Sequence, residues 1–113
     1  MSAKLTSAVR RAALDVGVHV GRGTLACCAG PAYESPAEVR MLQTVGADVA
    51  TMSAAPEVRF AAKAGLNVAV IAAVTNAATG TSGSEITHGH VLKIAGRMSD
   101  ALARMIEQLV KNN

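Results

Sequence analysis

The sequence predicts an α/β fold with a mostly parallel sheet, because short apolar runs alternate with helical patterns along the chain. The apolar runs are Thr24 to Ala29, Ala47 to Met52 and Asn67 to Val74, and glycine or polar turn residues bound each of them. Such runs are typical of strands that are buried on both faces. The order strand, helix, strand, helix, strand gives two right-handed crossovers, and therefore a parallel sheet flanked by helices.

Spacing and capping signals predict the first two helices. Apolar residues at helical spacing between Leu5 and Val16 predict a first helix, which Gly17 ends. The segment Ser35-Pro36-Ala37-Glu38 combines a serine N-cap, a proline at the first helical position and a glutamate that closes a capping box. We therefore expect the second helix to begin there and to run to Gly46.

Two more helices complete the prediction. Pro56 begins a helix that ends at Gly65 and directs Val58, Ala61 and Ala62 inward. Residues 77–86 are mainly small and polar, which predicts a loop. The last helix is amphipathic and covers the core with one apolar stripe. The stripe consists of Val91, Ala95, Met98, Leu102, Met105 and Leu109.

Length and composition exclude several classes of protein. With 113 residues, half of them apolar, the chain is expected to form one core and one domain. It has no apolar stretch of the roughly 20 residues that cross a bilayer, and its start lacks the apolar part of a signal peptide, so we expect a cytoplasmic protein. A net charge of +3 without a basic run, and one Tyr with one Phe, argue against a general nucleic-acid binder.

Cysteines and missing motifs narrow the chemistry further. Cys27 and Cys28 lie in an apolar run, so we expect buried, reduced thiols, and two adjacent cysteines are too few for a zinc site. The sequence has no phosphate-binding Gly-x-x-x-x-Gly-Lys loop, no Gly-x-Gly-x-x-Gly turn, no Gly-x-Ser-x-Gly elbow and no His-Glu-x-x-His helix. No metal is expected.

Polar side chains follow each of the three predicted strands. Because the carboxyl ends of parallel strands meet at one edge of a sheet, we expect these side chains to share a ligand pocket. Glu34 precedes a helix N-terminus, where the helix dipole favours a carboxylate, and Tyr33 offers an aromatic face to a planar ligand. The amide of Asn76 both donates and accepts hydrogen bonds, as recognition of a heterocycle requires.

Met52 and Ser53 end the second predicted strand, and His88 and His90 flank the start of the last helix. These four residues and the three above have a simpler interpretation, which their positions leave open. Glu34 is then a carboxylate at a helix start, Tyr33 a surface aromatic and Asn76 a turn former. Ser53 is a helix cap, Met52 a core thioether, and His88 and His90 are surface histidines.

Six segments carry a family resemblance: Gly30-Pro-Ala-Tyr-Glu-Ser-Pro-Ala-Glu-Val-Arg-Met-Leu42, Gly46-Ala-Asp, Met52-Ser53, Pro56-Glu57-Val58, Thr75-Asn76 and His88. In order, spacing and chemistry they resemble the trimeric purine nucleoside phosphorylase family, within the superfamily that also holds the methylthioadenosine phosphorylases. The similarity runs from about Leu5 to the carboxyl terminus. It implies a three-layer, phosphorylase/hydrolase-like α/β fold.

The resemblance also implies an activity and a purine site. The reaction is phosphorolysis of inosine, guanosine and their deoxy forms to free base and ribose 1-phosphate, a glycosyltransferase step of purine salvage. Tyr33 packs against the purine, Glu34 binds its N1/N2 edge, and Asn76, next to Thr75, holds O6 and N7. Asparagine at position 76 favours 6-oxopurines, because the methylthioadenosine phosphorylases have aspartate there.

The remaining implied contacts lie on the ribose and phosphate side. Met52 lines the ribose pocket, Ser53 contacts phosphate and His88 reaches the ribose 5′-hydroxyl; catalysis is assigned to Asn76, Glu34 and His88. Inorganic phosphate is the co-substrate, and no other cofactor is implied. The sequence departs from the family at Ala54-Ala55 and at Gly89-His90.

Family members are longer than this chain, so the resemblance identifies residues 1–113 as a single carboxyl-terminal half-domain. It implies that most of the phosphate site lies in the other half. We therefore expect a base-binding half that is incomplete alone, with a purine nucleoside or base, a complementary amino-terminal half and further copies of the chain (a trimer in the family) as its partners. The alternatives are a non-catalytic purine-binding or oligomerisation remnant, and a binding module that uses an exposed sheet edge.

Overall fold

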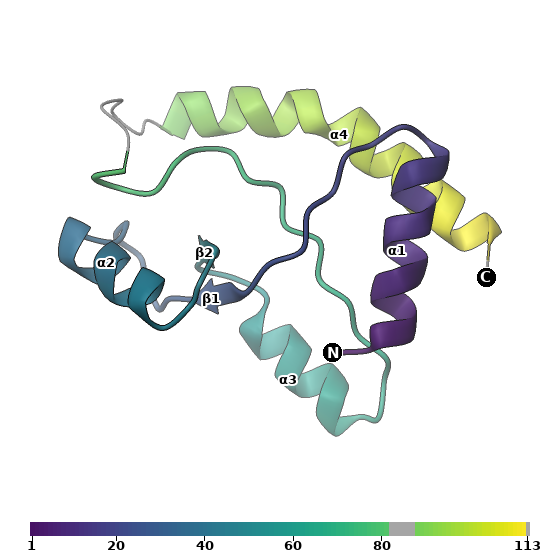
Figure 1. Cartoon of the computed structure of the whole chain (residues 1–113), viewed down its shortest axis with the longest axis horizontal. Helices are drawn as coiled ribbons and strands as arrows, with labels where there is room; N and C mark the ends of the chain where they lie inside the picture. The colour runs from purple at the N-terminus through teal and green to yellow at the C-terminus, as the bar shows by residue number, and fades with distance from the viewer. Residues whose placement is uncertain (82–87, 113) are drawn as a thin grey trace.

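The structure is a computed structural model that describes residues 1–81 and 88–112 (Figure 1). It contains four helices and two strands within these residues, in the order α1 (Ala3–Asp15), β1 (Leu25–Cys27), α2 (Pro36–Thr44), β2 (Val49–Thr51), α3 (Ala55–Lys63) and α4 (His88–Lys111). All four predicted helices are therefore confirmed. Of the predicted loop over residues 77–86, residues 77–81 contain a turn and residues 82–86 lie outside the described part.

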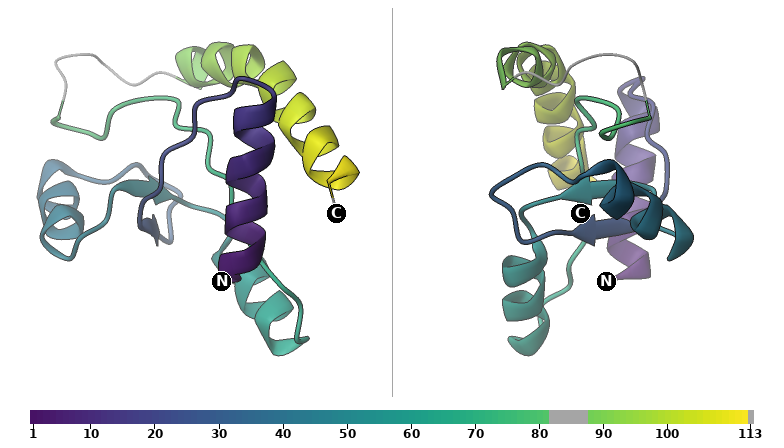
Figure 2. Two further views of the ribbon diagram at one scale, coloured as in Figure 1. Left: turned by 45° about the vertical axis from the view of Figure 1, so that its right-hand side comes forward. Right: turned by 90° about the vertical axis from the view of Figure 1, so that its left-hand side faces the viewer.

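Helices α1 and α4 form the main apolar core. Ser2 caps α1 by accepting a hydrogen bond from the amide of Leu5 (3.3 Å), and Gly17, at φ +70°, ends the helix. Figure 2 shows α1 beside the carboxyl-terminal part of α4, with α2 and the strands to one side. The buried side chains of this core are Val9, Ala12, Ala13 and Met105.

Strands β1 and β2 pair in parallel, with Leu25 opposite Val49 and Cys27 opposite Thr51. The carboxylate of Asp48 fixes the start of this ladder, because its Oδ2 accepts a hydrogen bond from the amide of Thr24 at 2.7 Å. Gly23 permits the approach, since a Cβ at that position would lie 2.9 Å from the same oxygen. These contacts align the carboxyl ends of both strands.

The capping box predicted for α2 is confirmed. The Ser35 hydroxyl accepts from the Glu38 amide at 3.4 Å, and the Glu38 carboxylate accepts from the Ser35 amide at 2.7 Å. The Ser35 hydroxyl also donates to the Glu38 carboxylate at 2.7 Å, and this bond, followed by that of the Ser35 amide, lowers the pKa of Glu38. The N-terminus of α2 is therefore held in place directly after the segment that carries Tyr33 and Glu34.

The prediction of a third, buried strand over Asn67 to Val74 is wrong. The segment is extended but unpaired, and Ile71 and Val74 are 38% and 54% exposed. Among the described residues its one backbone hydrogen bond is from the Ser2 amide to the Val68 carbonyl, at 2.8 Å. A strand needs a neighbour that takes its amides and carbonyls, and no described segment lies in that position. The α/β class is confirmed as a small parallel sheet with helices.

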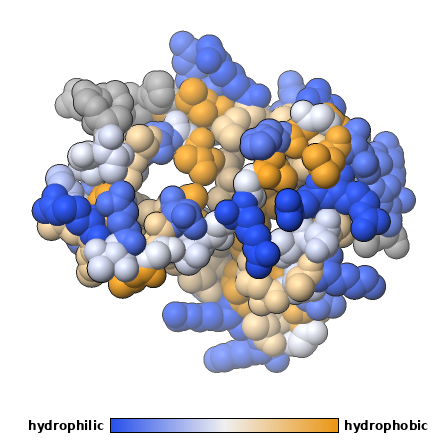
Figure 3. Space-filling model, viewed as in Figure 1, coloured by the Kyte–Doolittle hydropathy of each residue, from blue (hydrophilic) through white to orange (hydrophobic). Residues whose placement is uncertain are grey.

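The chain leaves much apolar surface in contact with solvent. Its accessible area is 8179 Å², whereas a compact monomer of this mass exposes about 5,800 Å². Its radius of gyration is 15.3 Å, against about 13 Å for a compact domain of this length. On α3 the inward orientation predicted for Ala62 is wrong, since Ala62 is exposed, and Phe60 is 74% exposed. Figure 3 shows the resulting apolar patches and hollows.

No helix among the described residues combines the length and the apolar character needed to span a membrane.

Replacing Met105 by alanine tests the α1–α4 core. Met105 is 2% exposed, so Met105→Ala leaves a cavity and should lower the free energy of unfolding by about 2–5 kcal/mol. The matched control is Met41→Ala, because Met41 is 56% exposed and should lose little. Urea denaturation followed by circular dichroism measures both; equal losses would contradict the assignment of this core.

The capping box should make α2 sensitive to pH. The pKa of Glu38 is lower in the folded chain than in the unfolded chain. Its contribution to the free energy of unfolding is therefore fully present above the ordinary glutamate pKa, and it is lost as pH falls through the folded-state pKa. Amide chemical shifts of Ser35 and Glu38 should report this loss in an NMR titration from neutral to acid pH. Glu38→Gln keeps an acceptor but cannot titrate, so its shifts should stay flat; a matching titration in that variant would refute the explanation.

Candidate functional site

Six of the seven substrate-contact residues expected from the sequence line one cleft of about 480 Å³: Tyr33, Glu34, Met52, Ser53, Thr75 and Asn76. The seventh is His88, whose side chain lies outside the described residues; α4 begins at His88, and Val91, one turn further on, lines the cleft. The His90 side chain falls under the same restriction. The cleft lies where β2 ends, between the segment that follows β1 and residues 70–76.

The segment between β1 and α2 places an aromatic ring and a carboxylate at the cleft. Tyr33 is 51% exposed and Glu34 is half-buried, and both come just before the N-cap Ser35. The positive end of α2 favours a negative charge at this position. Burial, together with the neighbouring Glu34 carboxylate, raises the pKa of the Cys28 thiol, so that thiol is a poor nucleophile at neutral pH.

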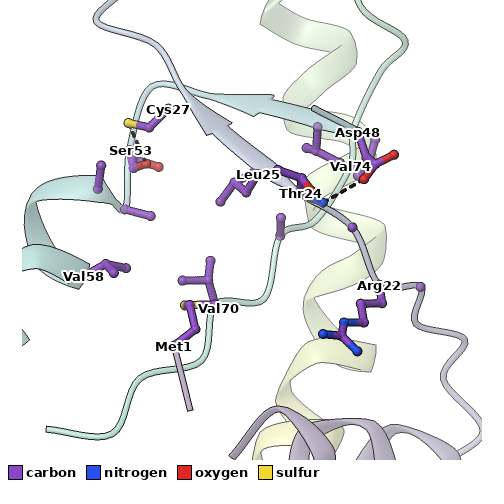
Figure 4. Close-up of a pocket in the computed structure, with 16 residues that line it drawn as sticks. Met1, Arg22, Thr24, Leu25, Cys27, Asp48, Ser53, Val58, Val70 and Val74 are labelled. Carbon is purple, nitrogen blue, oxygen red and sulfur yellow. Dashed lines mark hydrogen bonds between the residues drawn. The ribbon is translucent and has the colours of Figure 1, made fainter. Parts of the chain in front are cut away.

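Both cysteines are free thiols, as the sequence predicts, but they are not buried as a pair. Cys27 is exposed and its Sγ donates to the Ser53 carbonyl at 3.3 Å, while Cys28 is half-buried. The prediction of buried thiols is therefore wrong for Cys27, because the unpaired segment 67–74 leaves the face of β1 open. Figure 4 shows the Cys27–Ser53 contact, which ties the end of β1 to the turn after β2.

Gly30 and Met52 fit together across the cleft rim. Gly30 adopts φ +66°, and a Cβ there would lie 2.8 Å from the Met52 Sδ. Met52 can therefore lie over the backbone only because position 30 has no side chain. Met52 is 39% exposed, so the alternative in which it packs in the core is wrong.

The turn after β2 orients the Ser53 hydroxyl. Its Oγ lies 3.1 Å from the Thr51 Oγ1, and the Ser53 amide donates to that same oxygen at 3.3 Å. The alternative in which Ser53 caps α3 is also wrong, because the N-cap is Ala54, at φ +77°, without a side-chain capping bond. Ser53 is exposed and its hydroxyl lies at the cleft.

Asn76 keeps hydrogen-bonding capacity for a ligand. Its Oδ1 accepts from the Thr75 hydroxyl at 2.7 Å, and its Nδ2 donates to the Ala77 carbonyl at 3.0 Å. An amide has two donor hydrogens and two acceptor lone pairs, so one of each remains. Thr75 thereby holds the amide in one orientation at the cleft.

The cleft combines a carboxylate, an amide, a hydroxyl and an aromatic ring with the apolar wall formed by residues 70–74. Such a set suits a flat heterocycle with mixed donors and acceptors. In the described part of the chain no three His, Cys, Asp or Glu side chains are placed to hold a metal ion.

A second cleft, of about 550 Å³, was not expected from the sequence (Figure 4). It is lined by Arg22 and Asp48 as well as by apolar residues of β1, α3 and the segment 70–74. In the sequence, Asp48 is marked only by its place in the Gly46-Ala-Asp segment. The hydrogen bond that its carboxylate accepts from the Thr24 amide is known from the structure alone.

Comparison with known proteins finds a family match over almost the whole chain. The model of the phosphorylase superfamily matches residues 1–111. Purine nucleoside phosphorylase 1 of Geobacillus stearothermophilus is 34% identical over 98% of this chain and 40% of its own length. A probable 6-oxopurine nucleoside phosphorylase of Moorella thermoacetica is 39% identical over 88% of this chain and 38% of its own.

A solved structure agrees with these relatives. The crystal structure of a schistosoma purine nucleoside phosphorylase in complex with hypoxanthine superposes with a TM-score of 0.85 at 30% identity, over 95% of this chain and 40% of that one. The chain thus spans about 40% of the length of the relatives it matches. From the match over residues 1–111, the chain belongs to the phosphorylase superfamily.

Proposed function

We propose that this chain supplies the base-binding part of a purine nucleoside phosphorylase that acts on 6-oxopurine nucleosides. The observation that carries the proposal is the single cleft in which a carboxylate, an amide and an aromatic ring meet at the ends of β1, β2 and the segment 67–74. The family match and the hypoxanthine bound by the schistosoma relative support a purine as the ligand.

In this proposal three residues contact the purine base. Tyr33 packs against the purine ring, and Glu34 accepts hydrogen bonds from its N1/N2 edge. Asn76 donates its remaining N–H to the acceptors O6 and N7, in the orientation that Thr75 holds. A 6-oxopurine has acceptors on the edge that Asn76 faces, so a neutral amide is a better partner than a carboxylate would be.

The chemical step is attack of a phosphate oxygen on the anomeric carbon while the bond from that carbon to the purine breaks. The electron pair of the broken bond passes to the purine, and a hydrogen bond from Asn76 at N7 stabilises the developing negative charge. Met52 lines the ribose pocket, Ser53 contacts phosphate and His88 reaches the 5′-hydroxyl. Inorganic phosphate is the co-substrate.

Only Ser53 among these residues is assigned to phosphate, so we propose that turnover requires further polypeptide. The chain spans about 40% of its relatives, and we assign the remaining phosphate contacts to a complementary amino-terminal half. Assembly with that half would complete the larger sheet of the three-layer fold expected from the resemblance. The completed protein would then form the homo-oligomer typical of the family.

Purine preference tests the role of Asn76. Calorimetry should detect hypoxanthine or guanine binding to the full chain, and Asn76→Asp should shift the preference toward adenine by about tenfold, because the new carboxylate accepts from a 6-amino group and repels O6. The matched control is Asn67→Asp, an exposed site outside the cleft, which should leave the preference unchanged. Absence of purine binding, or an equal shift in both variants, would refute the assignment.

Turnover tests the incompleteness of the site. The pure, monodisperse chain should show no appreciable phosphate-dependent cleavage of inosine in a coupled assay for hypoxanthine, because most of the phosphate contacts are assigned elsewhere. The reference is any full-length relative assayed in parallel. Robust turnover by the chain alone would overturn this part of the proposal while leaving the base assignment intact.

A further inference from the structure

The two polar groups assigned to the edges of the purine come from two different segments of the chain. Glu34 directly precedes the N-cap of α2, whereas Asn76 follows the extended stretch 69–74. Among the described residues, no amide or carbonyl of residues 69–74 takes part in a backbone hydrogen bond. A binding site works only when its groups are held at a fixed separation. The Asn76 segment therefore needs another contact that holds it against the Glu34 side.

Gly80 makes such a contact with the start of α2. It adopts φ +77°, and a Cβ at this position would lie 3.2 Å from the Pro36 Cβ and 3.4 Å from the Pro36 Cγ, whereas two carbon atoms in contact normally lie about 3.5–4.0 Å apart. The loop backbone can lie this close to Pro36 only because position 80 has no side chain. Figure 1 shows the segment that ends at residue 81 beside α2.

The helix side of this contact is fixed. Pro36 is the first residue of α2 and follows the N-cap Ser35, whose capping box with Glu38 holds the helix start. The loop side has no comparable hydrogen bond to α2 among the described residues. A side chain added at position 80 would therefore displace the loop and leave the helix in place.

A short turn connects Gly80 to Asn76. The Thr81 amide and the Thr81 hydroxyl both donate to the Ala78 carbonyl, at 3.0 and 2.6 Å. Ala78 lines the purine cleft, and the Asn76 Nδ2 donates to the Ala77 carbonyl at 3.0 Å. Since each step along this turn is bonded to the next, a displacement of Gly80 is passed on to the Asn76 amide.

We propose that Gly80 is a positioning residue of the purine cleft: its backbone, seated against Pro36, sets the separation between the Glu34 carboxylate and the Asn76 amide. Gly80 does not itself line the cleft, so it acts through the turn. This inference rests on the proposed function, which gives the two groups a common ligand. Displacing the turn should weaken the contacts of Asn76 with the base and leave those of Glu34 intact.

Paired substitutions in the full chain test the contact. Asparagine adopts positive φ more readily than most residues, so Gly80→Asn keeps the backbone conformation and adds a Cβ against Pro36. Calorimetry should show hypoxanthine binding weakened about tenfold, as for one lost hydrogen bond. Pro36→Gly removes the crowding atoms, so the double variant should recover most of the affinity. The matched control is Gly46→Asn, because Gly46 has φ +83° and nothing within 4 Å of its Cβ position.

A second ligand separates positioning from general damage to the fold. 7-Deazahypoxanthine has a C–H in place of the N7 acceptor but keeps the N1 edge that Glu34 contacts. Gly80→Asn should therefore reduce the preference for hypoxanthine over this analogue, as Asn76→Ala should, and adding Pro36→Gly should restore the preference. A merely structural loss would lower the affinity for both ligands equally and would contradict the proposal.

NMR spectroscopy gives a readout that does not require purine binding. In the ¹⁵N-labelled chain, Gly80→Asn should shift the side-chain amide signals of Asn76, Pro36→Gly should return them toward their original values, and Gly46→Asn should leave them in place. Unshifted Asn76 signals, or shifts that Pro36→Gly does not reverse, would overturn the proposal. If the unsubstituted chain bound no hypoxanthine, the proposed function would fail, and the Asn76 signals would still decide whether Gly80 positions the amide.

Discussion

The packing of α1 against α4 is the interaction on which the rest of this structure depends. Four of the five side chains classed as buried among the described residues, Val9, Ala12, Ala13 and Met105, belong to it, and the fifth, Val39, lies on α2. Burial of apolar surface is the main stabilising term in folding. The strands and the helices α2 and α3 are connected to this core by extended stretches, and apart from Val39 they contain no buried side chain, so they have little apolar support of their own.

Local contacts compensate for that weak support at the candidate site. The Asp48 carboxylate fixes the start of the two-stranded ladder, the capping box fixes the start of α2, and Met52 lies over Gly30. Each of these contacts is a direct hydrogen bond or a close steric fit. They fix the local backbone without a large apolar core around it. They bring the segments after β1 and β2 to one edge, where residues 75 and 76 complete the cleft.

Much of this cleft could be predicted from the sequence, because its residues lie at strand ends and beside a strong capping signal. Tyr33 and Glu34 could be located from the capping box at Ser35, which is encoded within four residues. The second cleft could not be predicted, because it depends on residues 69–74 remaining unpaired. The run from Asn67 to Val74 has the composition of a buried strand, but composition carries no information on whether a neighbouring strand is present.

By itself the sequence determined the helices, the capping box of α2, the parallel pairing class and the residues that meet at the candidate site, since each rests on local spacing or on strand-end placement. Only the tertiary structure decided how much of the apolar surface is covered, that Cys27 is exposed, and that residues 19–23 and 69–74 face each other with free backbone groups. The physical reason is that hydrogen bonds within a helix are satisfied within one segment, whereas those of a strand require a partner from elsewhere in the fold.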